Sequence, residues 1–159
     1  MIGSEQLTMA AANEVAHKFK KAGVSLTRFN ISQMNWGKFS TDLVDATHVL
    51  LILSARHNAP VSELHRKNVA EITNLLHLTH REVMPRMSVL FLTPFAVEEF
   101  GWLIGENHAS AVFATSSLTM SKIPSSNMRM VLIEDLTYPP TADKLVEATI
   151  GKPALINAT

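Results

Sequence analysis

Short apolar runs alternate with amphipathic segments along most of the chain. Apolar positions three or four residues apart predict helices over residues 7–23, 36–46 and from about 61 to the residue before Pro85. Compact apolar runs predict strands over 24–31, 47–54, 87–94, 110–117 and 128–135. A further helix is predicted over 95–108 and a closing helix over 141–150, with 118–127 as a loop because of its Ser, Pro and Asn content.

Two of the predicted helices carry clear buried faces. In the first helix the apolar face consists of Ala11, Val15, Ala16 and Phe19, the last turn carries three lysines, and Gly23 supplies the end. In the long helix the apolar stripe consists of Val61, Leu64, Val69, Ile72, Leu75 and Leu76.

Helices that alternate with doubly apolar strands are typical of a parallel sheet covered on both faces. We therefore expect residues 1–159 to form one three-layer α/β domain, with a mostly parallel sheet of about five strands, of flavodoxin-like or Rossmann-like kind. Such folds normally begin with a strand, whereas this pattern begins with a helix. Without a first strand, one edge of the sheet would have unpaired backbone groups. A second protein chain could pair with or shield that edge.

The composition narrows the function classes. Hydrophobic residues make up 47% of the chain and charged residues 18%, which is enough apolar material for a core. Lys plus Arg number 14 and Asp plus Glu also 14, so no electrostatic footprint for duplex nucleic acid or an anionic membrane is expected. The absence of cysteine excludes disulfides, thiolate metal sites and cysteine nucleophiles. No secretory leader or long apolar span is recognised, and a cytoplasmic location is expected.

In open α/β sheets, ligands bind at the carboxyl ends of the strands. The six glycines form neither GxGxxG nor GxxxxGK[ST], so the common phosphate loops are absent. The segment "SARHNAP" remains a candidate anion site, with Arg56 as the cation and Ser54, His57 and Asn58 beside it. Ser116 in "TSS" is a second candidate. The alternative for both segments is an ordinary polar turn.

The segment "FAVEEFGWLIGENH" places two adjacent acids on a predicted helix. Acids early in a helix favour its positive N-terminal dipole without any catalysis. The functional alternative makes Glu99 or Glu98 a catalytic base or a ribose-binding acid beside Trp102. His77 and His80 have a spacing that can chelate a metal, but no third ligand falls in register, so no metal site is predicted and no cofactor is named.

Three segments resemble known families. The first seventy residues resemble the start of a flavodoxin, with "THVLLILSARHNAP" in the position of a flavin-contacting loop. Residues 48–105 resemble part of the adenylate-forming enzymes through Ser54–Pro60, "HRKNV" and "LTPFAVEEFGWLIG". The loop glycines and the lysine of that family are absent, so the resemblance implies a relative that does not adenylate. "EFGWLIG" before a strand and "KIPSS" is similar to the glutamate helix of bacterial TIR-like nucleotide-binding domains, where Glu99 would be the catalytic acid.

Each resemblance covers at most half of the chain, so no function is transferred from it. The sequence favours a non-catalytic or degenerate α/β module that acts through protein association, as a homo-oligomer or as a subunit. The alternative is a nucleotide- or flavin-binding enzyme or sensor with its site at the strand ends. Whether the protein is an enzyme stays open at this point.

Overall fold

The computed structural model describes residues 4–55, 62–78, 86–105, 111–123 and 129–132, together with Leu145 and Thr149. The helices are α1 (Ser4–Lys21), the short 3-10 helix η1 (Ile31–Gln33), α2 (Trp36–Asp45), α3 (Glu63–Leu78), α4 (Pro94–Phe100), α5 (Trp102–Gly105) and α6 (Ser117–Lys122). The strands are β1 (His48–Leu53), β2 (Arg86–Phe91), β3 (Ala111–Ala114) and β4 (Arg129–Leu132).

The four strands form one all-parallel sheet in the order β1-β2-β3-β4. Their last residues are in register, because Leu53 pairs with Phe91, Phe91 with Ala114, and Ala114 with Leu132. The predicted α/β class with a parallel sheet is confirmed. Every chain segment that follows a described strand therefore leaves from the same edge of the sheet.

The strand predicted over 24–31 is not formed. Residues 24–30 are irregular, and η1 follows them. Their apolar alternation is satisfied by packing alone, since Phe29 and Ile31 lie against the core while no strand pairs with the segment among the described residues. The described sheet accordingly has four strands where about five were expected.

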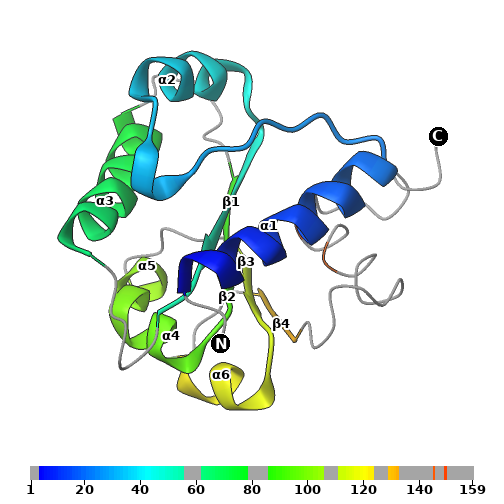
Figure 1. Ribbon diagram of the computed structural model, residues 1–159, viewed down its shortest axis with the longest axis vertical. Helices are drawn as coiled ribbons and strands as arrows, with labels where there is room; N and C mark the ends of the chain where they lie inside the picture. Colours follow the sequence, from blue (N-terminus) through cyan, green and yellow to red (C-terminus); the bar gives the residue numbers. More distant parts are fainter. Residues whose placement is uncertain are drawn as a thin grey trace.

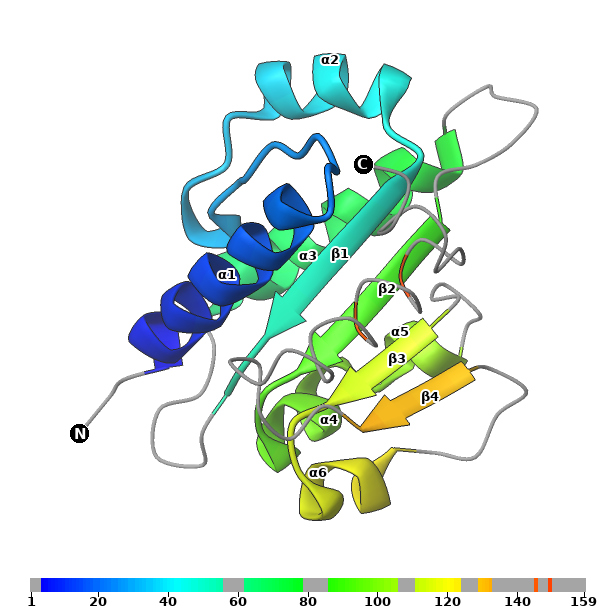
Figure 2. The same cartoon turned by 90° about the vertical axis from the view of Figure 1, so that its right-hand side faces the viewer.

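Apolar side chains alternate between the two faces of the sheet, as the two-residue period of a strand requires. In β2, Val89 and Phe91 pack on one face and Leu90 on the other. The first face is covered by α2, α3, α4 and α5, which lie behind the sheet or above it in Figure 2. The second face packs against α1 and Leu145. Helices thus cover both faces, which is compatible with a three-layer α/β arrangement.

Helix α1 lies along β1, at one margin of the sheet (Figures 1 and 2). Its buried residues are Ala11 and Val15, followed by Phe19, and Ala22 just beyond the helix is also buried. Gly23 follows with a φ of 80°, a left-handed conformation that ends the helix as the sequence predicts.

Three predicted elements need correction. The apolar stripe of α3 excludes Leu64, which lies in the first turn of the helix and is 56% exposed. The helix predicted over 95–108 is, up to residue 105, two short helices, α4 and α5, interrupted at Gly101, and residues 106–108 lie outside the described residues. The loop predicted from residue 118 begins as helix α6, because the Ser116 side chain caps its N-terminus.

Candidate functional site at the strand ends

Ser54 follows β1 and is almost fully buried, with 2% of its surface exposed. Its hydroxyl oxygen lies 2.7 Å from the hydroxyl oxygen of Thr8 in α1. This hydrogen bond joins the first turns of α1 to the carboxyl end of β1, across 46 positions of sequence. The predicted ligand-binding residue Ser54 is therefore at the expected edge, and its side chain holds a helix in place.

Thr93 is the second residue after β2 and lies beside Ala55, the second residue after β1. Its hydroxyl accepts a hydrogen bond from the Ala55 N–H at 3.1 Å and donates one to the Ala55 carbonyl oxygen. The same oxygen accepts from the Ala96 N–H at 3.3 Å and so caps α4, with Pro94 in the first helical turn. One side chain thus continues the β1–β2 pairing beyond the strands and starts the next helix.

Ser116, the second predicted ligand-binding serine, has a similar structural task after β3. Its hydroxyl oxygen accepts from the Thr119 N–H at 3.1 Å, which caps α6, and it also donates to the Thr119 hydroxyl at 2.9 Å. The neighbouring Thr115 donates to the Leu92 carbonyl oxygen at 3.0 Å and ties β3 to the segment after β2. The hydroxyl groups at this edge therefore bond to the protein itself.

Glu99, the predicted catalytic acid, lies near the end of α4 rather than at its start. Its carboxylate accepts a hydrogen bond of 2.9 Å from the Arg66 guanidinium, and the two side chains form an ion pair. The Glu99 side chain is 16% exposed and the Arg66 side chain is 49% exposed. The contact links α4 to the first turn of α3 and pairs the predicted catalytic acid Glu99 with a cation.

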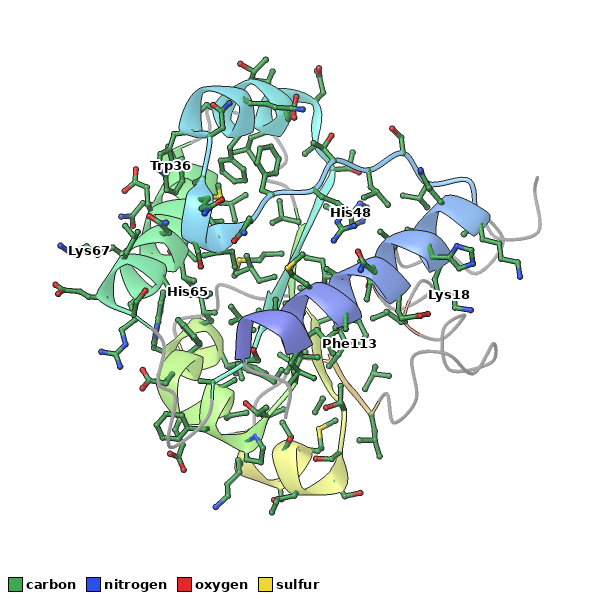
Figure 3. All side chains as sticks on the ribbon, viewed as in Figure 1. Lys18, Trp36, His48, His65, Lys67 and Phe113 are labelled. Atoms are coloured by element: carbon green, nitrogen blue, oxygen red, sulfur yellow. The ribbon has the colours of Figure 1, made fainter. Side chains whose placement is uncertain are left out.

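His65, beside Arg66 in α3, lies between polar and aromatic neighbours. Its Nδ1 is 3.5 Å from the Ser32 hydroxyl oxygen, and its ring centroid is 5.9 Å from that of Phe100. Figure 3 labels His65 on the same side of the molecule as Lys67. The imidazole packs η1, α3 and α4 together, so its environment is that of a structural histidine.

The remaining predicted ligand-binding residues, Arg56, His57 and Asn58, lie outside the described residues, as does the side chain of His77 and all of His80. Within the described part of the chain, Ser54 and Ser116 share the strand-end edge, whereas Glu99 is engaged with α3. Among the described residues, the hydrogen bonds of that edge join hydroxyl groups to one another or to backbone groups.

The sequence assigned no role to three residues that make these contacts: Thr8, Thr93 and Arg66. The dipeptide Thr93–Pro94 is a helix-start signal and could have identified the cap of α4. Neither Thr8 nor Arg66 carries a local signal, because their partners are 46 and 33 positions away.

No helix among the described residues is both long enough and apolar enough to cross a membrane. Comparison of the chain with protein-family models, with curated protein sequences and with solved structures finds no significant match.

Proposed function

We propose that the protein is a non-catalytic α/β module that acts through association with other protein chains, as a homo-oligomer or as a subunit. The observation that carries this proposal concerns β1, one of the two outer strands of the described sheet: some of its peptide N–H and C=O groups have no backbone partner among the described residues. The strand-end chemistry agrees with it, since the Ser54 and Ser116 hydroxyls and the Glu99 carboxylate are all occupied by structural contacts.

The direction of the β1 peptide groups follows from one hydrogen bond. The Leu53 carbonyl oxygen accepts from the Leu92 N–H at 2.9 Å, so Leu53 faces β2. In a parallel ladder alternate residues bond to the same neighbour, so Val49 and Leu51 also face β2. The N–H and C=O groups of Leu50 and Ile52 therefore point to the opposite side. Among the described residues no backbone hydrogen bond joins them to a partner.

Helix α1 covers this margin but cannot pair with it. Its own backbone groups are used within the helix, and the side chains it buries are apolar, such as Val15 and Phe19. Leu50 and Ile52 are only partly buried, and the strand sequence HVLLIL holds neither proline nor a formally charged Lys, Arg, Asp or Glu that would oppose pairing. Strand addition from a second chain, with a local shift of α1, would satisfy these groups.

The test compares the self-association of three variants, two at Ile52 and one at Leu51, by sedimentation and light scattering over a wide concentration range. Ile52→Pro removes an outward N–H without touching the β1–β2 ladder, and it should weaken association by about tenfold, since each copy loses one hydrogen bond. Ile52→Ala keeps the N–H and should associate like the parent chain. Leu51→Pro breaks the β2 ladder and should lose the native circular dichroism spectrum.

Two results would overturn the proposal. A chain that remains strictly monomeric and that recovers no bound protein in a defined binding assay has no associating edge. Equal association of Ile52→Pro and Ile52→Ala, both folded, would place the contact elsewhere on the molecule.

The aligned strand ends favour one other candidate, a nucleotide- or flavin-binding site. In-register ends bring Ser54 and Ser116 to one edge, where such ligands bind in α/β proteins. Thermal-shift measurements with FMN, NAD, ATP and AMP test it. A rise of several degrees in the unfolding midpoint that is lost in Arg56→Ala would support this candidate and would contradict the proposal of a non-catalytic module.

A further inference from the structure

The end of α1 concentrates positive charge on a chain whose formal charge is zero. Residues 13–30 contain four cations, Lys18, Lys20, Lys21 and Arg28, and one acid, Glu14, a formal charge of 4 − 1 = +3. The other residues then contain ten cations and thirteen acids, or 10 − 13 = −3. We call the four cations the α1 basic patch. Its charge is therefore a local asymmetry rather than a property of the whole chain.

Helix geometry places this charge on the solvent side of α1. With about 100° between successive residues, Lys20 and Lys21 lie opposite the buried Val15 and Phe19. Both lysines are exposed, and Lys18 at the flank is half-buried. Arg28 joins them because its guanidinium donates a hydrogen bond of 2.8 Å to the Asn13 side chain of the same helix.

The helix dipole explains only a small part of this patch. A helix C-terminus is equivalent to about half a negative charge, which is much less than four cations. Among the described residues the ion pairs are Arg66–Glu99 and Lys67–Glu63, and neither involves a member of the patch. Figure 3 places Lys18 on the opposite side of the molecule from Lys67. Within the described part of the chain, no acidic side chain forms an ion pair with this charge.

Leu26, between Lys21 and Arg28 in the chain, is 37% exposed and offers an apolar side chain on the segment that carries the cations. A patch of one helical turn is small for a nucleic acid, since such binding commonly uses about six to ten phosphate contacts. We infer that the α1 basic patch docks an acidic segment of a partner protein that also carries an apolar side chain. This inference rests on the proposed function only in requiring a protein partner, because it uses a different surface from β1.

The test measures binding of a fluorescein-labelled, glutamate-rich peptide with interspersed leucines, by fluorescence anisotropy at low salt. The triple variant Lys18→Gln, Lys20→Gln, Lys21→Gln should bind about eightfold more weakly, since each exposed cation contributes roughly a factor of two. The matched control Lys38→Gln, Lys67→Gln, Lys122→Gln removes the same charge from α2, α3 and α6. It should bind within about twofold of the parent.

Added salt should weaken binding to the parent and have little effect on the patch variant. Equal weakening in both triple variants would overturn the inference, because net charge and not the patch would then control binding. Tighter binding of a single-stranded oligonucleotide than of the peptide would also overturn it. Neither readout depends on self-association at Ile52, so a failure here and a failure of the β1 proposal are distinguishable.

Discussion

The Thr93 hydroxyl stabilises both the segment after β1 and the start of α4. It bonds to the N–H and C=O groups of Ala55 and to the Ala96 N–H. Thr93→Val keeps the side-chain shape but removes these bonds at a place where Ala55 is 0% exposed. We expect the free energy of unfolding, measured by urea titration, to fall by about 1–3 kcal/mol, because buried amide groups lose their partner.

Thr93→Ser is the matched control, since it retains the hydroxyl and loses only a methyl group. It should unfold within about 1 kcal/mol of the parent chain. If the valine variant were as stable as the serine variant, the hydroxyl would contribute nothing to the folded state.

The Arg66–Glu99 ion pair is expected to be weak in spite of its short distance. Its guanidinium side chain is 49% exposed, so solvent screens the attraction. A double-mutant cycle with Arg66→Met and Glu99→Gln should give a coupling energy of about 0.2–1 kcal/mol in urea unfolding. A coupling above about 3 kcal/mol is typical of a desolvated pair and would contradict the exposure seen here.

At the scale of single elements, the break between α4 and α5 depends on Gly101. A Cβ atom at this position would lie 2.6 Å from the Val97 carbonyl oxygen, closer than backbone atoms allow. Gly101→Ala should therefore lower the free energy of unfolding by about 1–3 kcal/mol, as overpacking usually does.

Gly37 in α2 offers a control of the opposite sign. A Cβ there would meet only the Asn35 side chain, at an ordinary 3.7 Å. Gly37→Ala should raise the free energy of unfolding by about 0.5–1 kcal/mol through its better helix propensity. The difference between the two substitutions, read from urea titrations in one buffer, tests the steric explanation directly.

The helices and strands that could be predicted from the sequence are those whose hydrophobic pattern fits only one type of element. Four of the predicted strands form, because runs such as 48–53 are apolar on both faces and fit only a covered sheet. The fifth, over 24–31, fails because alternation alone does not supply a neighbouring strand. Helix α6 was missed because Ser and Thr indicate a loop by composition, although Ser116 and Thr119 have the spacing of a helix cap.

Only the location of the strand-end site was predictable. The alternation of helices and apolar strands predicts parallel strands, and parallel strands bring Ser54 and Ser116 to the same edge of the sheet. The roles of their hydroxyls depend on partners such as Thr8, which the fold brings close and no local pattern marks. The ion pair of Glu99 has the same origin, since Arg66 lies on a different helix.

For the whole molecule, the sheet couples two apolar cores that lie on its opposite faces. Phe19 is buried in the α1 core, whereas Trp36 and Trp102 pack against the other core. Phe19→Ala should cost about 3–5 kcal/mol and should lower the unfolding midpoints of tryptophan fluorescence and circular dichroism together. A fluorescence midpoint left unchanged would mean that the two cores unfold separately.

The strands lie side by side in the same order in which they occur in the chain. A nascent chain can therefore lay each of them on a template that has already emerged from the ribosome, beginning with β1 and ending with β4. Helix α1 is made before β1 and lies along its outer margin, so a neighbouring polypeptide that reaches this margin before α1 docks would meet the earliest-made strand of the sheet.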